Sequence, residues 1–166
     1  MISKVYFPRL VLPASSVITS LADFLVSAAI MAVLMVWYSY LPSPNILCLP
    51  LFIGMAFAIG LGAGIWIAAL MVRYRDFRFI VPFIVQFGLY ISPVGFYSSV
   101  VPGPWRLLYS LNPMVGVIDG FRWAILGGEH IIYLPGFVLS LVVLAALVGT
   151  GMWYFRKTER AFADII

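Results

Sequence analysis

Charge is what this sequence has least of. Only 10% of its 166 residues are Asp, Glu, Lys or Arg, whereas about 25% is usual in a soluble domain. Hydrophobic residues make up 64% of the chain, and its mean hydropathy is +1.09. A soluble domain of this size cannot bury that much apolar surface, because most of its residues must face water. The composition excludes an ordinary soluble enzyme, a disordered tail and a nucleic-acid-binding module, and it predicts a protein whose solvent is largely lipid.

Reactive side chains are equally scarce. Cys48 is the only cysteine, so no disulfide can form within the chain, and its apolar surroundings favour a buried, inert thiol. His130 is the only histidine, and neither H-E-x-x-H nor G-x-S-x-G occurs to give it catalytic or metal-binding partners. The phosphate-binding motif G-x-x-x-x-G-K-S/T is also missing, so the chain cannot bind ATP by that route. We therefore expect no metal, cofactor or catalytic residue in this chain.

Long uncharged runs are what the sequence does contain. A helix needs about 20 apolar residues to cross a bilayer. Segments 17–37, 46–72, 79–97 and 134–155 meet this requirement, and only the first holds a charge. The sequence predicts an all-α integral membrane protein, with residues 1–166 forming one membrane domain of four transmembrane helices.

The region between the last two spans is apolar but interrupted. Pro102 begins a Pro-Gly-Pro breaker cluster, Asn112 before Pro113 is typical of a helix N-cap, and Gly127 marks a helix end. A helix over 113–126 is about 21 Å long, which is too short to cross. We expect a re-entrant or interfacial pair of helices, 105–111 and 113–126. The second has an apolar face and an acid and a base three residues apart that can pair: Met114, Val117, Ile118, Phe121 and Ile125, and Asp119 with Arg122.

The cations predict the orientation. With four spans, the N-terminal segment, the loop between the second and third spans and the C-terminal tail share one side, and they hold eight cations against two opposite. This distribution places both termini in the cytoplasm. Trp153 and Tyr154 near the end of the last span are typical of interfacial anchors. The eight cations are Lys4, Arg9, Arg73, Arg75, Arg78, Arg156, Lys157 and Arg160.

Two features inside the spans have more than one interpretation. Asp23 is the only charge within a span, and it can couple transport to an ion, bond at a helix interface or face a watery vestibule. Gly60, Gly62 and Gly64 predict close approach of another helix rather than a nucleotide site.

Two segments on the predicted cytoplasmic side mix cations with aromatic residues. Residues 4–10 precede the first span, and residues 73–78 connect the second and third. Each segment is suited to anchoring at lipid headgroups or to docking on a cytoplasmic partner.

Several motifs, taken in order, resemble the permease subunits of ABC-2 type exporters, and most closely their polysaccharide branch, which moves lipid-linked O-antigen, capsule or teichoic-acid polymers. The resemblance extends from Lys4 to the tail. Family members have six spans after an amphipathic cytoplasmic helix, so we expect the N-terminal third to be missing and the chain to be a truncated product or a fragment. The motifs are Lys4-Val5-Tyr6-Phe7-Pro8-Arg9 with Leu12-Pro13, Tyr74-Arg75-Asp76-Phe77, Ser92-Pro93-Val94, and Leu111-Asn112-Pro113-Met114 with Gly120-Phe121-Arg122.

The resemblance implies roles for two groups of residues. The first contacts an ATPase subunit: Lys4, Tyr6, Phe7, Pro8, Arg9, Arg73, Tyr74, Arg75, Asp76 and Arg78. The second belongs to an extracytoplasmic gate over 102–126: Pro102, Trp105, Asn112, Pro113, Asp119, Phe121 and Arg122.

Residues that contact substrate do not carry over by motif. Aromatic rings stack on sugars, so aromatic residues of the third predicted span are channel-lining candidates together with Asp23, although each can instead face lipid or pack against a helix. The aromatic candidates are Phe83, Phe87, Tyr90, Phe96 and Tyr97.

The resemblance also implies the assembly. Two copies form a channel in the bacterial cytoplasmic membrane, in contact with membrane lipid, and separate ABC ATPase subunits bind ATP and Mg²⁺ to drive export of lipid-linked polysaccharide. Two alternatives stay open. One is a drug or small-molecule exporter of the same superfamily. The other is an integral-membrane glycan or lipid enzyme that uses Asp119, Arg122, Glu129 and His130.

Overall fold

The computed structural model is all-helical over the residues that the structure describes, 11–74, 76–127 and 132–163, with side chains described at 18–71, 74, 76–127 and 132–157. This confirms the all-α prediction. The elements are α1 (Val11–Trp37), η1 (Pro44–Cys48), α2 (Leu49–Arg73), α3 (Phe77–Ile91), η2 (Ser98–Val100), α4 (Gly103–Tyr109), α5 (Pro113–Leu126) and α6 (Leu134–Ala163), of which η1 and η2 are 3-10 turns.

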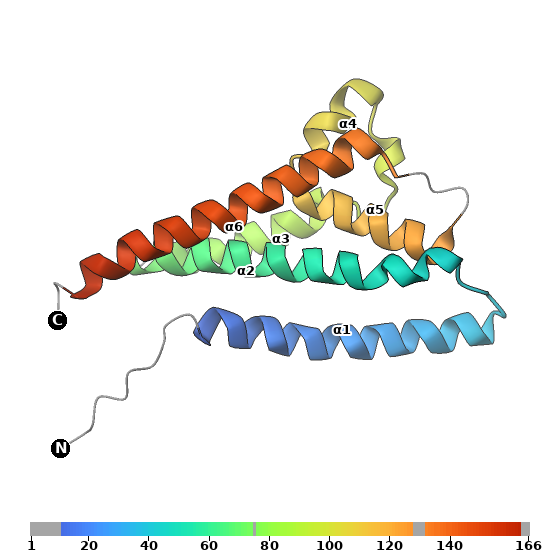
Figure 1. Ribbon diagram of the computed structural model, residues 1–166, viewed down its shortest axis with the longest axis horizontal. Coiled ribbons are helices and arrows are strands. Elements are labelled where there is room, and N and C mark those ends of the chain that lie inside the picture. Colours follow the sequence, from blue (N-terminus) through green and yellow to red (C-terminus); the bar gives the residue numbers. More distant parts are fainter. Residues whose placement is uncertain (1–10, 75, 128–131, 164–166) are drawn as a thin grey trace, which may run out of the picture.

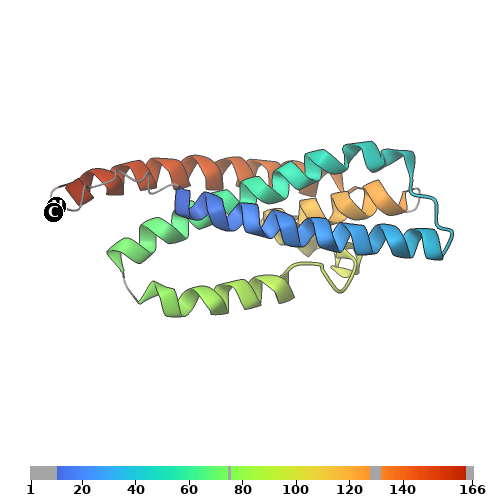
Figure 2. The ribbon, with the colours of Figure 1, turned by 90° about the horizontal axis from the view of Figure 1, so that it is seen from below.

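The long helices α1, α2 and α6 run along the longest dimension of the molecule (Figure 1). α5 lies beside the first half of α2 and also contacts α6. α3 starts next to the end of α2 and then runs apart from the other helices (Figure 2). The α1–α2 connection and the last turn of α5 meet at one end, where the Tyr40 hydroxyl donates a hydrogen bond to the Leu126 carbonyl at 3.0 Å. The α2–α3 connection lies at the opposite end.

Three described segments are long and apolar enough to cross a membrane: Ile18–Trp37, Pro44–Met71 and Leu134–Lys157. They agree with three of the four predicted spans. α1 begins at Val11, six residues before the predicted start. Pro13 does not prevent this, because proline is tolerated in the first turn of a helix. Asp23 consequently lies three turns inside α1 rather than close to its beginning.

The prediction of a helix over 79–97 is wrong for residues 92–97, because α3 ends at Ile91. Its 15 residues correspond to about 22 Å, less than the roughly 30 Å of a hydrocarbon core. Pro93 explains the end, since a proline disfavours the helical conformation of the residue before it, and Ser92 is extended with ψ 147°. Phe96 and Tyr97 therefore lie beyond the helix.

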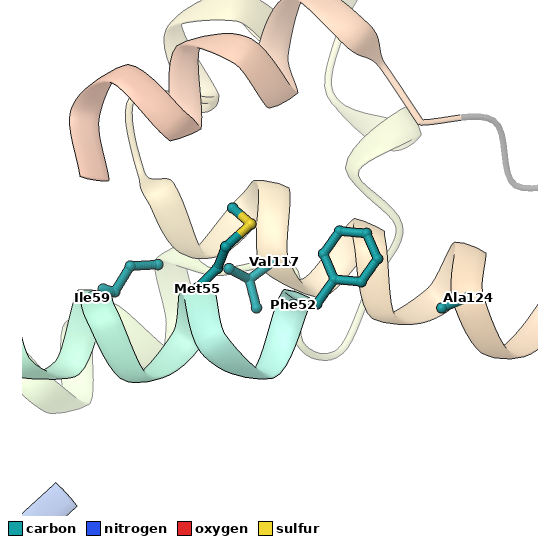
Figure 3. Close-up of a cluster of buried hydrophobic side chains, with 5 residues drawn as sticks. All are labelled: Phe52, Met55, Ile59, Val117 and Ala124. Atoms are coloured by element: carbon teal, nitrogen blue, oxygen red, sulfur yellow. The ribbon is translucent and has the colours of Figure 1, made fainter. Parts of the chain in front are cut away.

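The main cluster of buried apolar side chains joins α2 to α5. It consists of Phe52, Met55 and Ile59 from α2, and Val117 and Ala124 from α5 (Figure 3). The Phe52 ring meets Trp123 of α5 edge-on at 6.5 Å between centroids, and Phe137 of α6 at 6.1 Å. Because lipid removes the hydrophobic drive between helices, dense packing of this kind is what stabilises their association.

Small residues let these helices approach closely. A Cβ atom added at Gly120 would overlap the Phe52 ring, and one at Gly116 would lie 2.8 Å from Cβ of Ser140 on α6. Gly62 of α2 faces Val148 of α6, which confirms the predicted close approach at that position. The same prediction is wrong for Gly60, which has open space beside it.

A second contact joins α2 to α6 toward the C-terminal ends of both helices. The Trp66 and Tyr154 rings stack with centroids 4.9 Å apart, and Nε1 of Trp66 donates a hydrogen bond to Oγ1 of Thr150 at 3.1 Å. Phe155 is buried against Ile65 and Ala69. α2 and α6 therefore form a closely packed pair, and α5 packs against both.

Replacing Gly120 by alanine is expected to destabilise the protein by about 1–3 kcal/mol, because the added methyl overpacks against Phe52. Gly54→Ala is the matched control, since nothing lies within 4 Å of a Cβ atom there. Thermal unfolding in detergent measures both variants. Equal midpoints for the two would contradict the close contact between α2 and α5.

Candidate functional site

The predicted gate region folds into α4 and α5, and residues 92–102 connect α3 to α4. α4 begins at Gly103, two residues before the expected helix, because Pro104 fits the first turn; α5 has the predicted bounds. Pro102 is the N-cap of α4, and Trp105 is 62% exposed on it. Ser92 and Ser98 of the connection are buried. Buried polar and backbone groups need hydrogen-bond partners, and α4 and α5 supply them.

Asn112 holds the start of α5 and the end of α3 together. Its Oδ1 accepts a hydrogen bond from the Met114 amide at 3.1 Å, which is the predicted N-cap, with Pro113 at the first helical position. Its Nδ2 donates to Oγ of Ser92 at 3.0 Å. One amide side chain thus uses its acceptor for the cap and its donor for a contact between helices.

Arg122 binds the backbone of the connection from α5. Its two terminal nitrogens donate hydrogen bonds to the carbonyls of Phe96, at 2.8 Å, and Val94, at 3.1 Å. The guanidinium also lies over the Tyr97 ring, 5.0 Å from its centroid. Hydrogen bonds from a charged donor are about twice as strong as neutral ones. We call Ser92, Val94, Phe96, Ser98, Asn112, Asp119 and Arg122 the gate network.

Asp119 completes the gate network. Its Oδ2 accepts a short hydrogen bond of 2.5 Å from the Ser98 hydroxyl, and its Oδ1 lies 3.9 Å from Arg122. Both side chains are 20% exposed, so the pairing predicted from the sequence is present but is weaker than the direct hydrogen bonds.

Tyr109 of α4 contacts the end of α3. Its hydroxyl donates a hydrogen bond to the Ile91 carbonyl at 2.6 Å. Burial, reinforced by the Asp119 charge and opposed by Arg122, raises the pKa of Tyr109.

A small cavity with both polar and apolar lining residues lies beside the gate network. It has a volume of about 10 Å³, and Ser98, Arg106, Ser110 and Asp119 are among the residues that line it. The Arg106 guanidinium lies over the Tyr133 ring, 4.6 Å from its centroid. The volume is that of about one water molecule, so the cavity is too small for a sugar ring.

A wider, mostly apolar groove of about 310 Å³ separates α1 from α2 and α5. Phe121 bridges it, because its ring contacts Phe24 of α1 at 6.0 Å and Phe52 of α2 at 6.3 Å between centroids. The predicted apolar face of α5 partly turns toward this groove, through Met114, Val117, Ile118 and Phe121. The most deeply buried face of α5 is the neighbouring one: Val115, Gly116, Val117, Gly120 and Ala124.

Three of the predicted ATPase-contacting residues lie in the part that the structure describes, at the opposite end of the molecule from the gate network. Tyr74 and Asp76 are exposed in the α2–α3 connection, and Arg78 is exposed in the first turn of α3. The Tyr74 and Phe77 rings are 6.1 Å apart, and Arg78 lies over the Phe79 ring at 4.7 Å. The remaining predictions fall outside the described residues or side chains: Lys4, Tyr6, Phe7, Pro8, Arg9, Arg73 and Arg75.

The channel-lining candidates separate into two groups. Phe83, Phe87 and Tyr90 share one face of α3 and are 64%, 64% and 69% exposed. Phe96 and Tyr97, which were expected on the same helix, belong instead to the connection that Arg122 binds. Asp23 lies on an exposed part of α1, where its backbone carbonyl accepts a hydrogen bond from Ser27 at 2.9 Å.

Comparison with known proteins identifies the family. The sequence profile described as the ABC-2 type transporter matches residues 2–126. The chain belongs to the ABC-2 type transporter family. It is similar to a protein named O-antigen export system permease protein RfbA from Myxococcus xanthus, with 29% identity over all of this chain and 64% of that protein. Two proteins of the same name from Klebsiella pneumoniae are 26% and 25% identical over 99% of this chain and 63% of their length. The chain thus spans a little under two thirds of these relatives.

In this ABC-2 type chain, the structure joins motifs that sequence reasoning left separate. Ser92 and Asn112 belong to two of the quoted motifs, and they bond directly. Ser98 and Tyr109 were not predicted to take part, because no helical spacing or motif links them to Asp119 or Ile91. The bonds from Arg122 were also missed, because their acceptors are backbone carbonyls, which a sequence pattern does not reveal.

Arg122→Gln is expected to lower the free energy of local opening of the α3–α4 connection by about 1–3 kcal/mol. The substitution removes a charged donor from two backbone carbonyls. The amides of residues 94–98 would then exchange hydrogen at least about fivefold faster. Arg78→Gln is the control, since Arg78 lies at the other end of the molecule. Unchanged exchange at 94–98 in Arg122→Gln would contradict the role of Arg122.

Asn112→Ala and Asn112→Asp separate the two roles of Asn112. Alanine loses the cap and the bond to Ser92, whereas aspartate keeps the cap acceptor and loses only the donor. We expect alanine to cost about 1 kcal/mol more than aspartate in the free energy of unfolding. Denaturant titration in detergent measures this, and equal losses would indicate that the cap contributes nothing.

Proposed function

We propose that this protein acts as the membrane permease subunit of an ATP-driven exporter that moves lipid-linked polysaccharide across the cytoplasmic membrane. The observation that carries the proposal is the match of the whole chain to three proteins named as O-antigen export permeases. Three long apolar helices and the family assignment support it. The chain itself does no catalysis in this proposal, and ATP and Mg²⁺ bind to a separate ABC ATPase subunit.

The proposed topology has four crossings and both termini in the cytoplasm. α1, α2 and α6 cross as long helices, and α3 crosses with the help of the connection that follows it. α4 and α5 are the re-entrant pair. The hydrogen bond between Tyr40 and Leu126 supports this arrangement, because it places the end of α5 beside the α1–α2 connection. Segment 73–78, which holds three arginines and includes the α2–α3 connection, then faces the cytoplasm.

The proposed mechanism couples the two ends of the molecule. ATPase subunits bind residues 4–9 and 73–78, and their closure on ATP moves the helices that end there. α3 carries this movement to the gate network, because Ser92 and the following carbonyls are bound to α5. Two permease copies form the channel at their interface, and the exposed rings of Phe83, Phe87 and Tyr90 offer stacking surfaces to sugar rings.

The enzyme alternative has less support. Asp119 and Arg122 bond to Ser98 and to backbone carbonyls, so these bonds already use the charges that a catalytic site would need. Glu129 and His130 lie outside the described residues. A small-molecule exporter uses the same architecture, and the substrate itself distinguishes it from a polymer exporter.

Export from vesicles that contain the permease and its ATPase tests the substrate class. We expect ATP-dependent movement of a labelled lipid-linked polysaccharide and no ATP-dependent movement of small fluorescent dyes. Export of the dyes without the polymer would favour the small-molecule alternative. Movement of neither substrate by an assembled complex that hydrolyses ATP would contradict both.

Co-purification with the ATPase tests the coupling segments. Phe7→Ala combined with Arg9→Ala is expected to reduce the bound ATPase at least tenfold, because both an apolar anchor and a charge are lost. The control is Lys157→Ala, which removes a cation of the same predicted side from α6. ATPase binding that survives the double substitution would contradict the role of residues 4–9.

A further inference from the structure

We propose that the end of α6 that carries Arg156 and Lys157 binds one acidic phospholipid, with its phosphate on these two cations and an acyl chain along the groove beside them. This site depends on the membrane location of α6 and not on the transport function proposed above. Gly149, Met152, Trp153, Arg156 and Lys157 line an open groove of about 530 Å³. They recur at helical spacing, so they lie on one face of α6.

This face points away from the other helices. Gly151 and Phe155 are buried, and Gly151 approaches the Trp66 ring of α2. The groove residues lie on the other side, where Met152 is 45% and Trp153 63% exposed. A Cβ atom added at Gly149 meets nothing within 4 Å, so this glycine does not serve helix packing. It leaves a notch on the helix surface next to Met152 and Trp153.

The expected position of the groove along the membrane normal fits a phospholipid. Arg156 lies about 33 Å along the helix axis from Leu134, at about 1.5 Å per residue. A hydrocarbon core is about 30 Å thick, so an α6 that enters it at Leu134 brings Arg156 and Lys157 to headgroup depth. Trp153 then lies at the interface, where tryptophan is enriched. The apolar part of the groove, at Gly149 and Met152, extends into the hydrocarbon region.

The charge of the groove favours an acidic headgroup. Its two cations are exposed, and no described acidic side chain forms an ion pair with either of them. The Lys157 ammonium lies 5.2 Å from the Trp153 ring centroid, which holds the cation above the interfacial ring. Arg156 supplies a planar, bidentate donor for phosphate oxygens, and Lys157 adds a second point charge. A zwitterionic headgroup gains less from this pair, because its own cation is repelled.

The test measures lipid binding by the full chain in detergent. Fluorescent phosphatidylglycerol and phosphatidylcholine with identical acyl chains are titrated separately. We expect phosphatidylglycerol to bind about 30-fold more tightly, since each cation near an acidic headgroup contributes about a factor of five. Equal affinities for the two lipids would overturn the proposal.

Two pairs of variants test the two halves of the site. Arg156→Gln with Lys157→Gln should remove the roughly 30-fold preference, whereas Arg156→Lys with Lys157→Arg keeps the charges and should retain most of it. Gly149→Leu should fill the notch and weaken phosphatidylglycerol binding at least threefold with both cations in place. Gly54→Leu is its control, because Gly54 also has open space beside it but lies on α2.

The contradicting results are equally specific. A preference that persists in the double glutamine variant would show that other cations hold the headgroup. A Gly149→Leu variant that binds like Gly54→Leu would show that no acyl chain uses the groove. Glycerol 3-phosphate is titrated as a soluble competitor. Displacement of the lipid at equal concentration would mean that the site binds phosphate alone, and this too would overturn the proposal.

Discussion

The backbone between α3 and α4 must find hydrogen-bond partners in a protein with little water around it, and Arg122 meets much of this requirement. Pro93 follows the end of α3, and the Val94 and Phe96 carbonyls lie between α3 and η2, outside any helix. Irregular backbone at membrane depth is tolerated only where protein or a watery cavity satisfies it. Arg122 does so at the Val94 and Phe96 carbonyls, and Asp119 binds Ser98 from the same helix. The position of α5 therefore determines the path of the chain between α3 and α4.

Close packing fixes α5 itself. Gly116 and Gly120 bring α5 against Ser140 of α6 and Phe52 of α2, at distances that a larger side chain would prevent. α2 and α6 are held together further along by the stack of Trp66 on Tyr154. α3 has no buried residue and is tied at its end to α5. The proposed mechanism uses this difference, because it lets α3 move against the packed pair α2 and α6.

Much of this arrangement follows from the sequence by simple physical rules. Long apolar runs predict α1, α2 and α6, and Asn112 before Pro113 predicts the start of α5. The extent of α3 was overestimated, because hydropathy alone gave no weight to Pro93. The gate network could be predicted only in part. The spacing of Asp119 and Arg122 indicates that they can pair, but their stronger bonds go to Ser98 and to backbone carbonyls far away in the sequence, and no periodicity encodes these contacts. Helix packing is partly predictable as well, since glycines permit close approach at Gly62 but leave open space at Gly60.

In the proposed polymer exporter, Arg122 holds the gate. Export of labelled lipid-linked polysaccharide by the assembled transporter is compared between the parent and Arg122→Gln. We expect polymer export to fall at least tenfold in Arg122→Gln while the amount of bound ATPase is unchanged, because the substitution is remote from the α2–α3 connection. Polymer export at the parental rate, with the same bound ATPase, would contradict this role of Arg122.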